Sequence, residues 1–176
     1  MKKILLTLLF FSNLFSQANR LLMLSPSAHT SSIGNVMLPM MSPARNHLDS
    51  DRFTFSRVNW LGNIVGDMNY MHVNLAKGSF DFSTLIFNYG EQLETDITGV
   101  VTGKFSPMSS VWGVSWGGVI KGYNLGVTAK VIQHDLYVQK TFGTVFDIAT
   151  YLPKVYKDLD VDLALRNFGV APTFGT

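Results

Sequence analysis

The sequence predicts an all-β fold: a transmembrane antiparallel β-barrel, of which about the first seven strands are present, preceded by an N-terminal plug segment. Three observations predict it. Apolar residues alternate with polar ones over short segments, no apolar run beyond the N-terminus could form a membrane helix, and short connections alternate with long ones. A closed barrel is the arrangement in which strands satisfy their backbone hydrogen bonds within lipid.

Composition is more apolar than in most soluble proteins. Of 176 residues, 47% are hydrophobic and only 15% are charged, whereas soluble domains carry about a quarter charged residues. A hydrophobic soluble domain is the alternative. The net charge of +2 is scattered, so no nucleic-acid partner is predicted. The absence of cysteine excludes disulfides, thiolate metal sites and cysteine nucleophiles. No metal or cofactor is predicted, because the four histidines are not spaced as ligands: His29, His47, His72 and His134.

Residues 1–18 have the pattern of a secretory signal peptide. Lys2 and Lys3 form a basic head, an apolar run follows, and Ser16 and Ala18 suit a cleavage site after residue 18. The apolar run is too short for a spanning helix, and a buried N-terminal helix is the alternative. An exported chain with amphipathic strands and no membrane helix is predicted to lie in a bacterial outer membrane.

Residues 19–51 differ in kind from the rest of the chain, because they combine Pro26, Pro39 and Pro43 with many Met and Leu residues. Proline opposes long regular elements, and the apolar residues favour a plug packed on a barrel wall over an exposed linker. The predicted plug residues are Ser25, Pro26, Ala28 and Gly34.

Residues 111–131 carry the clearest strand signal. Trp112, Val114, Trp116 and Ile120 share one parity, with small residues between them. Lys121 and Gly122 form a turn, after which the apolar parity resumes at Tyr123, Leu125, Val127, Ala129 and Val131. This predicts a hairpin with one apolar and one polar face, as barrel strands have between lipid and water.

Other strands are predicted around Phe53, Tyr70, Phe80, Phe142 and Leu159, which makes seven with the hairpin. In the strand at Phe80 the apolar parity shifts near Ser83 and Thr84, which predicts a β-bulge. Lys77 and Gly78 are predicted to form a two-residue turn, residues 90–104 a long polar connection, and residues 153–157 a short link.

The last predicted strand alternates Leu159, Val161, Leu163 and Leu165 with polar residues. Carboxylates at every second position suit a wet barrel lumen better than a dry sandwich core. Inward charges need partners, so a lumen charge network is predicted for Lys130, Asp160, Asp162 and Arg166.

Connection lengths set the predicted orientation, because short turns of outer-membrane barrels are periplasmic and long loops extracellular. Residues 52–176 are predicted to form the N-terminal part of the barrel. An odd strand number is unusual for single-chain bacterial barrels, so the chain is expected to be the first part of a longer protein.

A series of short motifs runs along the chain. It comprises residues 22–34 (LMLSPSAHTSSIG), Tyr89-Gly90 with Glu94-Thr95-Asp96, and residues 102–106 (TGKFS), 125–130 (LGVTAK) and 165–169 (LRNFG). In this order and spacing the motifs resemble those of the PorV/PorQ family of outer-membrane proteins, and of its PorQ members most. Residues 22–34 are similar to the family opening L-x-x-P-x-S-A-R-x-x-A-L-G, although His29 replaces the arginine. In a second departure, the family's Asn-Pro-Ala segment appears only as Ser42-Pro43-Ala44.

This resemblance implies a FadL-like barrel of about 14 strands with an N-terminal plug, of which the C-terminal strands are not in this sequence. It implies a non-enzymatic component of the type IX protein secretion system. The implied partners are membrane lipid, a PorU-like sortase, PorZ-like and PorV-like components and secreted cargo proteins.

Partner binding is predicted on an extracellular loop, at Glu91, Glu94, Asp96 and Phe105; ordinary solvated loop residues are the alternative. A FadL-like channel for hydrophobic solutes is the second hypothesis, against which the polar lumen-facing residues stand. A membrane protease or lipase is the third. No catalytic residues are predicted, because no G-x-S-x-G or comparable constellation brings Ser, His and Asp together.

Overall fold

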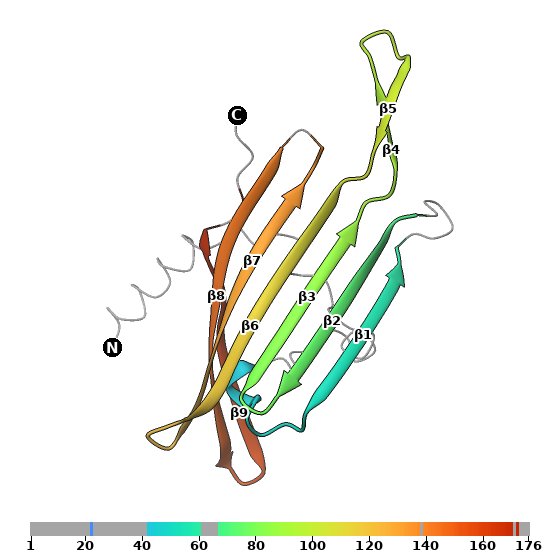
Figure 1. Ribbon diagram of the computed structural model, residues 1–176. Helices are drawn as coiled ribbons and strands as arrows, with labels where there is room; N and C mark the ends of the chain where they lie inside the picture. The colour runs from blue at the N-terminus through green and yellow to red at the C-terminus, as the bar shows by residue number, and fades with distance from the viewer. Residues whose placement is uncertain (1–21, 23–41, 61–66, 138, 171, 173–176) are drawn as a thin grey trace.

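The computed structural model describes residues 22, 42–60, 67–137, 139–170 and 172. They form one seven-stranded antiparallel sheet and a separate two-stranded hairpin (Figure 1). The order of the strands in the large sheet is β1 (Arg52–Asn59), β2 (Asn69–Lys77), β3 (Phe80–Asn88), β6 (Met108–Ile120), β7 (Tyr123–Asp135), β8 (Lys140–Tyr156) and β9 (Leu159–Val170). The all-β fold class and all seven predicted strands are therefore confirmed, and β1 and β9 are the two edges of the sheet.

The predicted connection 90–104 is not a loop. It contains β4 (Gln92–Thr95) and β5 (Val101–Phe105), which pair with each other and extend beyond the ends of β3 and β6 (Figure 1). The turn between them is built on Asp96, whose backbone N–H donates to Val100 O at 2.9 Å. Sequence reasoning missed this hairpin because the segment is largely polar. Its apolar residues are mostly exposed and do not belong to a packed core.

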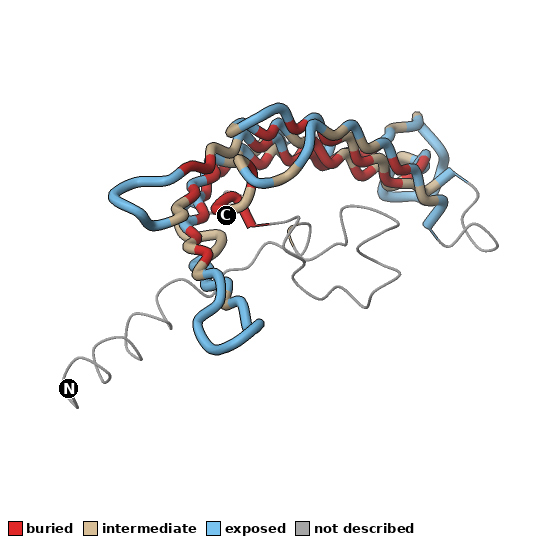
Figure 2. Tube along the Cα trace, turned by 90° about the horizontal axis from the view of Figure 1, so that it is seen from below, coloured by how far each residue is buried: buried red, intermediate tan, exposed pale blue. Residues whose placement is uncertain are grey.

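The sheet is curved. In Figure 2, seen from the end of the strands, it forms an arc, and the short 3-10 helix η3 (Pro43–Arg45) lies against β6, β7 and β8. Of the predicted plug, Leu22 and residues 42–51 are described; its other residues, including Ser25, Pro26, Ala28 and Gly34, lie outside the described part of the chain, as does the predicted signal peptide. Among the described residues, none of the helical segments combines the length and apolar character that crossing a bilayer would require.

The tight turns follow the predicted turn chemistry. Lys121 and Gly122 both have positive φ, 50° and 83°, and join register partners Ile120 and Tyr123; this is the mirror-image turn that suits the twist of a hairpin. The turn between β2 and β3 lies one residue later than predicted. Its two residues are Gly78 and Ser79, because Lys77 already pairs with Phe80.

Two predictions of local irregularity are wrong. Strand β3 keeps an unbroken register with both neighbours through Ser83 and Thr84, so it has no bulge. The apolar parity changes there because Leu85 and Phe87 pack on the inner face, whereas Phe80 and Phe82 are exposed on the outer face. Residues 153–156 belong to β8, and the register with β9 shifts between Leu152 and Tyr156, as a strand with an internal proline requires.

The convex, outer face of the sheet is apolar across its width. Residues in neighbouring strands that are register partners form two rows of this face. One row is Phe53, Leu75, Phe82, Val114, Ala129 and Phe146; the other is Phe80, Trp116, Val127, Ile148 and Leu165. Most of these side chains are exposed, among them Phe53 at 69% and Phe80 at 60%.

Candidate functional site

The concave, inner face of the sheet is polar in the half nearest the short turns. The rows of register partners there are Thr54, Asn74, Ser83, Gly113 and Lys130, and Ala76, Asp81, Ser115, Thr128 and Asp147. Most of these side chains are buried or half-buried. Charges removed from water must be paired, and two ion pairs satisfy this requirement.

The first ion pair joins β1, β2 and β3. Asp81 accepts hydrogen bonds from Asn74 Nδ2 at 2.7 Å to each carboxylate oxygen, and Arg52 Nη2 lies 3.4 Å from its Oδ2. Arg52 Nε also donates to Asn74 Oδ1 at 3.2 Å, and Asp49 Oδ2 lies 3.6 Å from Arg52 Nη1. Sequence reasoning missed this cluster, because its members come from three separate segments: residues 49–52, β2 and β3.

The second ion pair joins β7, β8 and β9. Lys130 Nζ lies 2.5 Å from Asp147 Oδ2 and donates to Asn167 Oδ1 at 3.0 Å, while the Asn167 backbone N–H donates to Asp147 Oδ1 at 2.8 Å. Asn167 has a φ of 55°, and the β8–β9 register shifts between Phe146 and Ile148, beside Asp147. This bulge turns the Asn167 backbone N–H toward the carboxylate of Asp147.

The predicted lumen charge network is thus divided in space. Lys130 is paired with Asp147, a residue that sequence reasoning missed, and Arg166 lies on β9, next to Asn167. Asp160 and Asp162 belong to a different group. Asp160 accepts from the Tyr151 hydroxyl at 2.6 Å and from the Lys154 backbone N–H at 2.9 Å.

Asp162 binds the segment that contains η3, by accepting a hydrogen bond from Ser42 Oγ at 2.8 Å. Two further contacts hold this segment. The Arg45 guanidinium lies 4.3 Å from the centre of the Tyr151 ring, and His47 Nε2 lies 3.1 Å from Asn124 Oδ1. Residues 42–47 are therefore docked on the inner face through side chains from β7, β8 and β9.

Two glycines make room for this segment. A Cβ atom at Gly117 would lie 1.9 Å from Pro43 O, and one at Gly126 would lie 2.2 Å from Ala44 N. Ala44 is fully buried and clusters with Ala149 and Tyr151. Contacts this close to backbone atoms tolerate no larger residue. The Ser42-Pro43-Ala44 segment is therefore the part that fits closely against the sheet.

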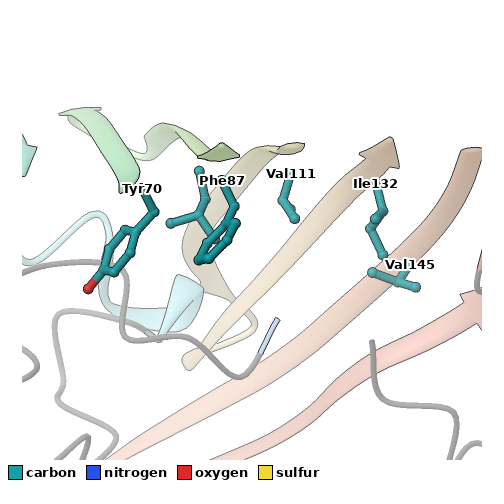
Figure 3. Close-up of a cluster of buried hydrophobic side chains, with 6 residues drawn as sticks. Tyr70, Phe87, Val111, Ile132 and Val145 are labelled. Atoms are coloured by element: carbon teal, nitrogen blue, oxygen red, sulfur yellow. The ribbon is translucent and has the colours of Figure 1, made fainter. Parts of the chain in front are cut away.

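The other half of the inner face, nearest the long connections, is apolar. Its buried cluster comprises Tyr70, Leu85, Phe87, Val111, Ile132 and Val145, several of which Figure 3 shows projecting from adjacent strands. Leu22, Val58, Met68 and Tyr89 pack against it. The inner face is thus not uniformly polar, contrary to the expectation drawn from alternation.

A serine and a histidine meet beside this cluster. Ser109 Oγ lies 2.6 Å from His134 Nδ1 and donates to the Tyr89 hydroxyl at 3.3 Å. Such a distance suits a nucleophile and its base. However, Ser109 has no exposed surface, so a substrate could not reach its hydroxyl in this conformation. The geometry gives this pair a structural role as cross-strand partners of β6 and β7.

The residues predicted to bind a partner all lie on or beside the β4–β5 hairpin. Glu91 is paired with Lys104 at 2.6 Å, Glu94 accepts from the Tyr137 hydroxyl at 2.9 Å, and the Phe105 ring centre lies 4.6 Å from that of Tyr137. Asp96 caps the turn. The structure therefore brings the predicted residues together and gives each a partner within the chain.

No group of three metal-ligating side chains occurs in the described parts of the chain. The chain was also compared with known proteins. No family model, no curated protein and no solved structure matches it.

Proposed function

We propose that this protein is a non-enzymatic outer-membrane β-barrel component of the type IX protein secretion system, which binds or scaffolds cargo and sortase partners at the cell surface. The observation that best supports this proposal concerns the outer face. Aromatic and aliphatic side chains form continuous rows on it and are exposed. Exposed apolar patches of this extent are rare on soluble monomers and mark a surface that meets lipid or protein.

The dimensions of the outer face support lipid as that environment. Along β7 the outward positions run from Tyr123 through Leu125, Val127 and Ala129 to Val131, which is about the 9–11 residues that a tilted spanning strand needs. The inner residues of the same strand include Asn124, Thr128 and Lys130. Apolar-out and polar-in alternation is the pattern of barrel strands in the outer membrane.

The secretion role rests on the resemblance of the sequence to the PorV/PorQ family. Docking of the Ser42-Pro43-Ala44 segment on the inner face supports an N-terminal plug, a feature that the resemblance also implies. A rigid hairpin beyond the sheet supports a binding role at the surface.

The experiment that tests the proposal is deletion of the gene in the source bacterium, with fractionation of the wild-type strain. The protein is expected in the outer-membrane fraction as a heat-modifiable band. The deletion is expected to leave proteins with a C-terminal secretion domain in the periplasm. Normal secretion by the deletion strain would refute the secretion role, and recovery in a soluble fraction would refute the membrane role.

A FadL-like channel for hydrophobic solutes remains the second candidate, because one observation favours it. The apolar cluster around Phe87 and Ile132 lies on the inner face, where a hydrophobic solute would pass. Uptake of radiolabelled oleate separates the two candidates: the channel predicts reduced uptake in the deletion strain, and the scaffold predicts unchanged uptake.

A further inference from the structure

The β4–β5 hairpin presents apolar side chains to solvent. Leu93 is 58% exposed, Ile97 is fully exposed, and Val100 and Val101 are 60% and 52% exposed. These four residues are named the hairpin tip. The hairpin as a whole extends past the end of the seven-stranded sheet (Figure 1).

One side of the hairpin is attached to the connection between β7 and β8. Glu94 and Phe105 both contact Tyr137, the side chain of the β7–β8 connection. Tyr137 has a φ of 70°, an unfavourable conformation for a residue with a side chain. The two contacts join the hairpin to this connection and offset that conformational cost. The side available to a partner is therefore the one that carries the hairpin tip.

The turn at Ile97 is closed by several hydrogen bonds. Asp96 Oδ1 accepts hydrogen bonds from Thr98 N at 2.8 Å, Thr98 Oγ1 at 2.6 Å and Val100 N at 2.9 Å. Gly99, with a φ of 83°, closes the turn by donating to Asp96 O at 3.0 Å. A surface that is ordered before binding loses less conformational entropy when a partner docks.

Lipid does not fit this surface. Strand β5 alone, five residues long, spans about 15 Å at about 3.3 Å per residue. The tip therefore stands beyond the apolar rows that would contact the bilayer. Residues 91–105 carry three carboxylates, on Glu91, Glu94 and Asp96, but one lysine, Lys104, which is paired with Glu91. That excess of negative charge disfavours an anionic membrane surface and favours a basic protein surface.

We infer that the hairpin tip docks into an apolar pocket with a Lys- or Arg-rich rim on a partner protein at the outer side of the membrane, with Ile97 as the central anchor. This inference rests on the proposed function and names the contact surface of the hairpin. Apolar anchors that enter a pocket carry most of the energy of such interfaces, while charged rims set orientation and association rate.

The test uses the full-length protein in cells of its source, with the photo-crosslinking residue benzoylphenylalanine at position 97, at position 100, or at the control position 79. Ser79 lies in the β2–β3 turn, at the opposite end of the sheet. A discrete adduct with another protein is expected at 97 and 100 and absent at 79. The crosslinked peptide of that protein is expected to be apolar and flanked by Lys or Arg.

The captured protein is then purified and titrated against the full-length protein in detergent. Ile97→Glu is expected to weaken binding at least tenfold. Gln92→Glu, which adds the same charge at an exposed position on the other face of the hairpin, beside Phe105, is expected to change it less than threefold. Equal weakening by both variants would overturn the apolar anchor.

Three crosslinking outcomes also overturn the inference: an adduct of two differently tagged copies of this chain, an adduct with lipid, or no adduct at positions 97 and 100. Fractionation of the same cells separates this failure from failure of the proposed function. A heat-modifiable protein in the outer membrane without an adduct refutes the docking surface alone, whereas a protein absent from the outer membrane refutes the proposed function.

Discussion

Gly117 of β6 and Gly126 of β7 are register partners, and together they form the depression in which Pro43 and Ala44 lie. Neither glycine is required by a turn, since each lies within a strand. Glycine is needed here because the backbone of another segment approaches too closely for a Cβ atom. The pair therefore ties the N-terminal segment to the centre of the sheet.

Replacing Gly126 by alanine is expected to displace residues 42–47 from the inner face. The added Cβ would lie 2.2 Å from backbone atoms of Pro43 and Ala44, and such overpacking costs about 1–3 kcal/mol. Trypsin cleavage after Arg45 in detergent measures the displacement and is expected to become faster. Gly118→Ala is the control, because the atoms nearest to its Cβ would belong to the Trp116 side chain and not to residues 42–47. Equal cleavage rates in all three proteins would show that the glycines do not hold the segment.

A charged residue on the outer face is expected to hinder membrane assembly, and more strongly the closer it lies to the middle of the bilayer. Val127 lies at the middle of β7, so Val127→Arg should cost about 2–4 kcal/mol, whereas arginine near the interface costs about 0–1 kcal/mol. Gln133→Arg, on the same face near the end of β7, is the matched control. Unfolding in detergent-lipid mixtures, followed by the heat-modifiable band, gives both values. Equal costs at the two positions would argue against a lipid-facing surface.

The same reasoning applies to β9, where neighbouring residues face opposite sides. Leu163 is 56% exposed on the outer face, whereas Asp162 accepts a hydrogen bond from Ser42. Leu163→Arg is expected to hinder assembly. Asp162→Asn is expected to be nearly silent, because the amide oxygen can still accept that hydrogen bond. Normal assembly of Leu163→Arg, measured by outer-membrane fractionation, would reverse the assignment of the two faces.

Asp147 is expected to be essential for stability as the counterion of Lys130. The side chains of the pair are 4% and 19% exposed, respectively, and removing one partner of a buried ion pair costs about 3–5 kcal/mol. Asp147→Ala should therefore lower the unfolding temperature strongly. The double variant Lys130→Met with Asp147→Leu removes both charges and should recover most of the loss. If Asp147→Ala alone were neutral, the ion pair would contribute nothing to the fold.

The hairpin turn is expected to loosen in acid. Hydrogen bonds from the Thr98 hydroxyl, and from the backbone of Val100 and Thr98, hold the pKa of Asp96 below its ordinary value of 3.8. The stabilisation is thus present above that value and is lost as the pH falls through the lower, folded pKa. Nitrogen-15 relaxation of Ile97 in detergent should report motion at acidic pH, and at neutral pH in Asp96→Ala. Ile132, buried in β7, is the control; an Ile97 signal that stayed rigid in the variant would contradict this role of Asp96.

Strand positions could be predicted because each strand has a local signal. Apolar alternation such as that of Trp112, Val114 and Trp116 depends only on the period of a strand, and Lys121-Gly122 has its own turn chemistry. The same rule produced the false bulge in β3. Leu85 and Phe87 do not continue the alternation of Phe80 and Phe82, because they belong to the apolar cluster on the inner face. The local sequence does not reveal that cluster.

The inner-face contacts were only partly predictable, because they join residues distant in sequence. Charges on an inner face need partners, and this rule predicted that Lys130, Asp160 and Asp162 would be paired. It could not predict which residues they pair with. Asp147 was missed because it follows Phe146 within an apolar strand. The bulge beside Asp147 could have been suspected from Asn167, because asparagine tolerates a positive φ better than most residues. The β4–β5 hairpin also had one, Asp96 followed three residues later by Gly99, which is typical of a turn.

The most direct test of the central claim, that the outer face contacts lipid, is a cysteine scan of β7. The chain has no cysteine, so each variant from Tyr123 to Gln133, with Gly126 left unchanged, carries one thiol for a nitroxide spin label in reconstituted outer-membrane lipid. The account predicts a period of two. Collisions with oxygen should be highest at the lipid-facing positions 125, 127, 129 and 131 and low at 124, 128 and 130. Equal accessibility of both sets to a water-soluble nickel chelate would contradict the claim and indicate a sheet exposed to water on both faces.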